Sequence, residues 1–206
     1  MSNYLDRLRL METGTPTISA SFGLNPTTYA VSTDEAPYLT LTIISSYTHS
    51  ITIFADDLSP RLITQTGCTL VITGLTDNTD VKQTTRTHCR IPLPRKVAVP
   101  FDESLFYILL PGQPLIPLAP FTGSSKSRSP NGVDGLKPGQ RYVITLSGSQ
   151  RFQWNRIRWW EYGTKEELLA KGLDGREVRY GRGPHEPIEI DISGIQGNPI
   201  YLDCRH

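Results

Sequence analysis

The stretch LKPGQRYVITL, residues 136–146, decides the fold class because it joins a tight turn to a regular strand. Pro138 and Gly139 suit the two central positions of a type II turn, since proline presets its φ angle and glycine tolerates the positive φ of the second position. From Tyr142 onward every second residue is apolar and faces the same side, as in a strand with one face buried. The stretch therefore predicts a turn that leads into a strand of a β-rich fold.

The same alternation recurs along the chain and predicts nine or ten strands. Strands are expected at residues 18–22, 38–43, 51–53, 70–73, 97–101, 105–110, 142–146, 188–192 and 200–202. At 51–53 we expect Ile51 and Ile53 to face inward and Thr52 to face outward. Because no helix alternates with these strands, a doubly wound parallel sheet is disfavoured.

The turn and its strand also resemble a known family. The pattern formed by Leu136, Pro138, Gly139, Tyr142 and Ile144 is similar to the E–F corner of fibronectin type III and other immunoglobulin-like sandwiches. In that family the tyrosine is a "tyrosine corner", whose hydroxyl group bonds to nearby backbone. The resemblance covers about a dozen residues and implies an architecture, with no activity attached to it.

This resemblance implies an all-β fold, an enlarged immunoglobulin-like antiparallel β-sandwich with one or two short helices. The sandwich is expected to be enlarged because 206 residues are about twice the usual length of such a domain. The chain also resembles small uncharacterised fungal proteins that pair a Pro-Gly corner strand with a WWxYGTKEE segment, here residues 159–167. That second resemblance implies no activity.

Only two places are predicted to be helical. Thr164 and Glu167 form a capping box, in which the threonine hydroxyl accepts from the backbone of Glu167 and the glutamate reaches back to Thr164. Gly172 is suited to end this short helix. We expect residues 1–16 to be an N-terminal tail or short helix and residues 17–206 to form a single β-sandwich domain.

The candidate ligand site is the arginine- and tryptophan-rich stretch at 154–162. If it is one strand, Ile157 and Trp159 face the core, because alternate residues share a face. The other face then carries five large side chains: Trp154, Arg156, Arg158, Trp160 and Tyr162. This face is either a self-contained ladder of arginines stacked on aromatic rings or a platform for a planar anionic or aromatic ligand.

The charge composition argues against one class of partner, nucleic acid. Lys and Arg number 21 against 20 for Asp and Glu, so the chain lacks the excess positive charge of a general nucleic-acid binder. Single-stranded nucleic acid, which binds to stacked aromatic rings, is therefore a third and disfavoured hypothesis.

No apolar run is long enough to cross a membrane, and the N-terminus lacks a secretory apolar core. Three cysteines without CxxC spacing predict a reducing, cytoplasmic compartment.

No catalytic or metal-binding motif stands out. His88 and Cys89 are neighbours, so in a strand they point to opposite faces and are poorly placed to act as base and nucleophile; His49 or His185 would partner Cys89 only through the fold. The four histidines lack metal-ligand spacing, so we expect no metal and no cofactor.

The leading hypothesis is thus a non-catalytic binding protein that recognises a small organic ligand or a partner protein. The alternative is a cofactor-independent isomerase, cyclase or hydrolase that acts on a small organic substrate in an enclosed apolar pocket. A buried His, Asp, Glu or Arg inside such a pocket would favour the enzyme.

Overall fold

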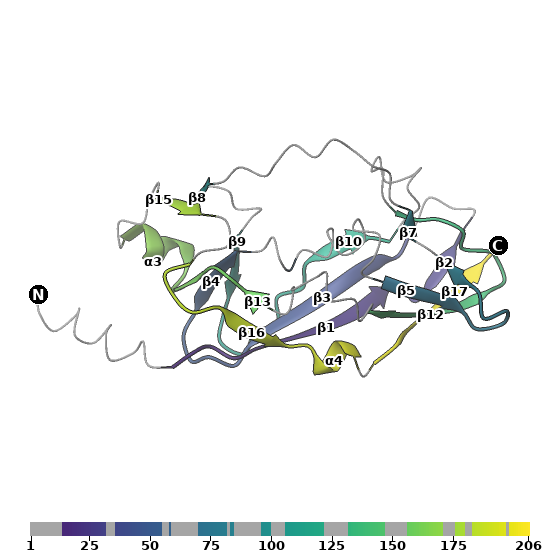
Figure 1. Cartoon of the computed structure of the whole chain (residues 1–206), viewed down its shortest axis with the longest axis horizontal. Helices are drawn as coiled ribbons and strands as arrows, with labels where there is room; N and C mark the ends of the chain where they lie inside the picture. Colours follow the sequence, from purple (N-terminus) through teal and green to yellow (C-terminus); the bar gives the residue numbers. More distant parts are fainter. Residues whose placement is uncertain are drawn as a thin grey trace, which may run out of the picture.

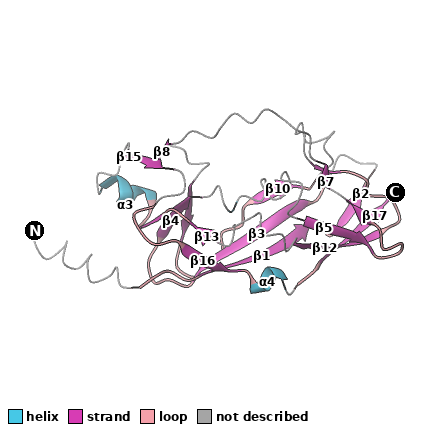
Figure 2. Ribbon diagram, in the orientation of Figure 1, coloured by secondary structure: helices cyan, strands magenta, loops and turns pink. Residues whose placement is uncertain are grey.

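The computed structural model describes residues 14–31, 36–54, 58, 70–81, 83–84, 96–99, 106–121, 132–146, 156–170, 176–179, 183–196 and 198–206. Strands make up most of this part of the chain, and the two helices described in it are short. Figure 2 shows them beside the strands. The expected all-β, sandwich-like fold is confirmed. Residues 1–13, which make up most of the expected N-terminal tail or short helix, lie outside the described residues, as do Trp154, Gly172 and Cys89.

The longest sheet runs along the long axis of the molecule (Figure 1). Its strands, in spatial order, are β10 (Leu118–Pro120), β3 (Tyr38–Ser45), β1 (Ile18–Asn25), β16 (Ile188–Asp191) and β13 (Arg156–Ile157). β1 and β3 pair antiparallel along their whole length, whereas β16 joins β1 in parallel. The alternation expected for β3 and β16 is confirmed, since every second side chain is buried.

A second sheet forms the end of the molecule that carries the C-terminus (Figure 1). Its order is β2 (Thr28–Ala30), β17 (Ile200–Arg205), β12 (Arg141–Leu146), β5 (Leu70–Gly74) and β6 (Asp80–Val81). β2 and β17 pair in parallel, and the other pairs are antiparallel. Tyr142, Ile144 and Leu202 turn inward and are buried.

The opposite end holds a three-stranded sheet and the longer helix. The strands are β14 (Trp160–Tyr162), β4 (Ile51–Phe54) and β9 (Phe106–Leu109), and the helix is α3 (Lys165–Ala170). Two strand pairs and a helical turn complete the described elements: β11 (Gly132–Val133) with β7 (Gln83–Thr84), β15 (Arg176–Arg179) with β8 (Lys96–Val99), and α4 (Ser193–Gln196). One hydrophobic cluster draws buried residues from all three larger sheets.

The prediction for Thr52 is wrong. Ile51 and Ile53 are buried as expected, but Thr52 is also only 1% exposed. All four residues of β4 are buried, so both faces of this strand are covered. The Thr52 hydroxyl is satisfied there because it donates to the carbonyl oxygen of Gly163 at 2.7 Å.

The predicted turn is present, and the Tyr142 hydroxyl group bonds to nearby backbone. Gly139 has a φ of 76°, the positive value that the second position of a type II turn requires. The backbone N–H of Lys137 donates to the Tyr142 hydroxyl oxygen at 2.8 Å. Burial of Tyr142 raises the pKa of its hydroxyl group. The turn is also held to β17, because the N–H of Gly139 donates to the carbonyl of Cys204 at 2.8 Å.

The change Tyr142→Phe is expected to lower the free energy of unfolding by about 0.5–1.5 kcal/mol, because it removes the acceptor for the Lys137 N–H. Urea titration measures the difference. Tyr201→Phe is the matched control, since Tyr201 lies exposed on the neighbouring strand and has the Arg141 guanidinium over its ring. An equal loss in both variants would show that the corner hydrogen bond contributes nothing of its own.

The capping box is confirmed as well. The Glu167 N–H donates to the Thr164 hydroxyl oxygen at 3.4 Å, and the Thr164 N–H donates to a Glu167 carboxylate oxygen at 2.7 Å. α3 begins at the next residue, Lys165. Leu168 is buried and anchors this helix on the end of the molecule that carries β4 and β14.

Candidate functional site

The stretch expected to form one strand is divided between two sheets. β13, Arg156–Ile157, pairs with β16 in the long sheet, whereas β14, Trp160–Tyr162, pairs with β4 in the three-stranded sheet. Arg158 and Trp159 lie between the two strands. The single-strand interpretation is therefore wrong, because the chain crosses from one sheet to another in the middle of the motif.

This crossing changes which side chains face the core. Ile157 and Trp159 are buried, as expected. Trp160 is buried too, at 2% exposure, because β14 places it opposite Ile53 and turns its ring into the core. The expectation that Trp160 shares an open face with Arg156 is wrong.

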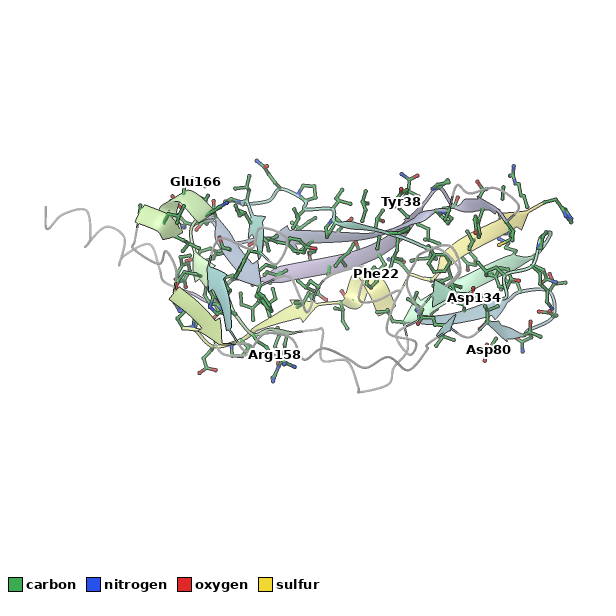
Figure 3. All side chains as sticks on the ribbon, turned by 90° about the horizontal axis from the view of Figure 1, so that it is seen from above. Phe22, Tyr38, Asp80, Asp134, Arg158 and Glu166 are labelled. Atoms are coloured by element: carbon green, nitrogen blue, oxygen red, sulfur yellow. The ribbon has the colours of Figure 1, made fainter. Side chains whose placement is uncertain are left out.

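The two arginines, Arg156 and Arg158, are not buried in the core. Arg156 is exposed and donates from Nη2 to Glu189 Oε1 across the β13–β16 pair at 2.9 Å. A surface ion pair of this kind contributes little to stability. Arg158 is half-buried, and Figure 3 shows its side chain projecting away from the ribbon.

The two adjacent tryptophans, Trp159 and Trp160, pack in different groups of aromatic side chains. The ring of Trp159 meets Phe106 edge-on at a centroid distance of 5.1 Å, and Phe106 meets Phe54 in the same manner at 5.5 Å. All three rings are buried, so they hold β4, β9 and the crossing together. Edge-to-face pairs of this kind are favourable beyond the area that they bury.

Trp160 belongs to a second group, which we call the aromatic cluster: Tyr47, His49, Trp160, Tyr162 and His185. The rings of Trp160 and His185 lie 4.4 Å apart at 30°, close to stacked. Tyr162 meets both of them edge-on, at 4.9 Å and 5.2 Å. Tyr47 lies 5.7 Å from Tyr162 and 5.8 Å from His49, in the turn between β3 and β4. Its members other than Trp160 are partly exposed.

A carboxylate–imidazole pair lies at this cluster. Nε2 of His185 is 2.9 Å from Oε1 of Glu161, and the two side chains are 29% and 16% exposed. The same carboxylate oxygen accepts from the Tyr162 N–H at 3.0 Å. A neutral imidazole that donates from Nε2 keeps Nδ1 as its basic nitrogen. The pair can therefore orient a ligand or transfer a proton.

The segment before β16 is held closely enough to bring His185 into place. A Cβ on Gly183 would lie 2.9 Å from the carbonyl oxygen of Arg158 and 3.0 Å from the Cα of Trp159, so only glycine fits this approach. The indole N–H of Trp160 donates to the carbonyl of Glu186 at 2.8 Å. His185 is thus fixed by backbone contacts on both sides.

Sequence reasoning missed His185 and Glu161 as a pair, since they are separated by a long stretch of chain. The available signal was the run Gly183-Pro184-His185-Glu186-Pro187, in which a glycine and two prolines surround one histidine. Such a segment is stiff and adopts few conformations. That stiffness is typical of a loop that presents one side chain in a fixed position.

Neither the buried cysteine nor a cluster of metal ligands provides a second candidate site in the described part of the chain. Burial raises the pKa of the Cys204 thiol to about 11, with a smaller contribution from Asp203, so the thiol is a poor nucleophile near neutral pH. Across the described ranges, no three His, Cys, Asp or Glu side chains come together as a metal site requires. In the same part of the chain, no helix is both long and apolar enough to cross a membrane.

The fold and the site together define a sandwich-like β protein with a partly exposed aromatic, imidazole and carboxylate group at one end. No protein-family model matches the chain, and no curated protein sequence matches it.

Proposed function

We propose that this chain is a non-catalytic binding protein and that the aromatic cluster, with Glu161, holds a small planar organic ligand. The observation that carries the proposal is the partly exposed His185–Glu161 pair among aromatic rings. Small-molecule sites combine aromatic surfaces with a few fixed polar groups in this way.

The ligand class follows from the polar groups. The two hydrogen bonds that Glu161 makes with other described residues both use Oε1. A carboxylate has about four acceptor positions, so within this part of the chain Oε2 has capacity for a donor from the ligand. The partly exposed rings of Tyr47, His49 and Tyr162 offer surfaces on which a planar group can stack. A planar amine or amidine fits these groups better than the carboxylate ligand that the arginines suggested, because Arg156 is paired with Glu189.

Two finer assignments accompany this proposal. We place the protein in the cytoplasm, on the support of three cysteines without CxxC spacing and a buried, free Cys204. We relate the sandwich to the immunoglobulin-like class, on the support of the Lys137–Tyr142 hydrogen bond at the tyrosine corner.

The alternative function is a cofactor-independent isomerase, cyclase or hydrolase. The specific observation in its favour is again the 2.9 Å contact of His185 with Glu161, because a carboxylate that orients an imidazole is the arrangement of a general base. In this version His185 accepts a proton from the substrate at Nδ1, and Glu161 stabilises the imidazolium that results.

One experiment separates the two. The Trp160 indole N–H signal of isotope-labelled protein is followed while aromatic amidines, aromatic amines and aromatic carboxylates are added separately. We expect saturable shifts of this signal with the amidines or amines, weakened about tenfold or more in Glu161→Gln. Tyr201→Ala, which changes an exposed ring at the other end of the molecule, is expected to bind as well as wild type.

The ligand signals in the same samples report turnover. Unchanged ligand over a day supports the binding protein, whereas conversion that stops in His185→Asn supports the enzyme. If no compound shifts the Trp160 signal, or if Glu161→Gln binds as well as wild type, the cluster is not the ligand site.

A further inference from the structure

The outer edge of β10 carries a second, independent inference. Every second residue of the segment 115–121 is hydrogen-bonded to β3 or to the residue just before it. Leu115 and Ile43 exchange two hydrogen bonds of 2.9 Å. The Leu41 N–H donates to the carbonyl oxygen of Pro117 at 3.1 Å, and the Phe121 N–H donates to that of Pro37 at 2.7 Å. Because strand residues alternate, the N–H and C=O groups of Ile116 and Leu118 point away from β3. β10 is the terminal strand of its sheet among the described residues.

This edge is open and apolar. Ile116 is 51% exposed and Leu118 57%, and Tyr38, opposite Pro120 on β3, is exposed beside them. Figure 3 shows Tyr38 on the long sheet, away from the end that carries Arg158. The sequence from Leu109 to Phe121, LLPGQPLIPLAPF, has no charged residue. Edge strands that must stay single are usually blunted by charged side chains or prolines. This edge has prolines but no charged residue.

The prolines limit the edge to two donors. Pro114 and Pro120 stand at positions whose N–H would also point outward, and proline has none. The donors that point outward are therefore those of Ile116 and Leu118, with a proline beyond each. Any strand added here pairs over a short central stretch.

We propose that β10 pairs antiparallel with β10 of a second copy of this chain, with Pro117 on the two-fold axis. In this register Ile116 of each copy lies opposite Leu118 of the other, and the two residues exchange both of their hydrogen bonds. Pro114 lies opposite Pro120, so the missing donors face each other and no N–H is left unpaired. Because neither edge carries a charge, the two edges meet without repulsion. The exposed side chains of Ile116 and Leu118 from both copies then lie side by side on one face of the joined sheet.

The self-complementarity of this register favours a second copy over an unrelated strand, because it accounts for the position of both prolines. A closed two-fold pair also leaves no further copy of the edge open, so it produces a dimer and no fibre. The ligand site is not involved, since the aromatic cluster lies on β14 and the segments around it.

The oligomeric state tests the proposal. Sedimentation of wild-type protein between about 10 and 200 µM is expected to show a dimer, and Leu118→Lys is expected to raise the dimer dissociation constant by about tenfold or more. Val71→Lys, at an exposed apolar strand residue on the other sheet, is the matched control and is expected to leave it unchanged. A monomer at every concentration overturns the proposal, as does a dimer that Leu118→Lys leaves intact.

A cross-link tests the register without depending on Leu118→Lys. Residues that face each other at a non-hydrogen-bonded position have Cα atoms about 4.5 Å apart, which a disulfide spans. We expect Pro117→Cys to form a disulfide between copies under mild oxidation, identified by mass spectrometry as a peptide joined to itself at residue 117. Val71→Cys is expected to give no such product. Equal cross-linking of both variants, or none at residue 117, contradicts the proposed register.

Discussion

Trp160→Ala is expected to lower the free energy of unfolding by about 3–5 kcal/mol, the usual cost of removing a large aromatic side chain from a core. The indole packs in the core between β4 and the segment before β16, meets the rings of Tyr162 and His185, and donates to Glu186. Urea or thermal unfolding measures the loss. The expected value is close to the whole stability of many domains, so Trp160→Phe serves as a milder second variant.

Arg156→Ala is the matched control for this prediction. Arg156 was expected to share a face with Trp160 but is exposed and paired with Glu189 across the sheet, so its removal should cost about 0–1 kcal/mol. Equal and small losses at both positions would contradict the buried position of Trp160. They would favour the single-strand interpretation instead.

Gly183→Ala is expected to lower the free energy of unfolding by about 1–3 kcal/mol, because the added methyl group meets backbone atoms that cannot rotate away. The contacts at issue are 2.9 Å to the Arg158 carbonyl oxygen and 3.0 Å to the Trp159 Cα. The segment must then move from the crossing, which separates His185 from Glu161. Unfolding experiments give the energy, and the imidazole NMR signals of His185 report the displacement.

Gly194→Ala provides the comparison. A Cβ there lies 3.6 Å from its nearest neighbours, an ordinary contact, and the residue is in α4. Alanine is preferred to glycine in a helix by about 1 kcal/mol, so this variant should be neutral or slightly stabilised. If Gly183→Ala proves no worse than Gly194→Ala, the close backbone approach at Gly183 is not what fixes His185.

Much of the β framework could be predicted because the signals are local. The period of two along β3, β12 and β16 reflects one buried face, and the turn at Gly139 and the cap at Thr164 each follow from a few adjacent residues. Thr52 shows the limit of this reasoning. Whether the second face of a strand is covered depends on segments far away in the sequence, here the one that carries Gly163, so a polar residue in the alternation does not guarantee an exposed face.

The site could be predicted only in part for a related reason. Ile157 and Trp159 were assigned to the core correctly, because alternation holds up to the crossing. Beyond it, two adjacent tryptophans are both buried, which a single strand with one buried face does not allow, and this was the sign that the chain changes sheets. The partner of Glu161 arrives from the segment before β16, and no pattern within residues 154–162 points to His185.

The parallel pairs of the two large sheets have a consequence for synthesis of the chain. β1 finds an early partner in β3, but β2 pairs only with β17 among the described strands, where Thr28 lies opposite Asp203. Closing so long a loop is slow, and contacts of this separation form late in folding. On the ribosome, β2 therefore remains without this partner until β17 has emerged, and the nascent chain is exposed to misfolding and chaperone capture while the residues between the two strands are made.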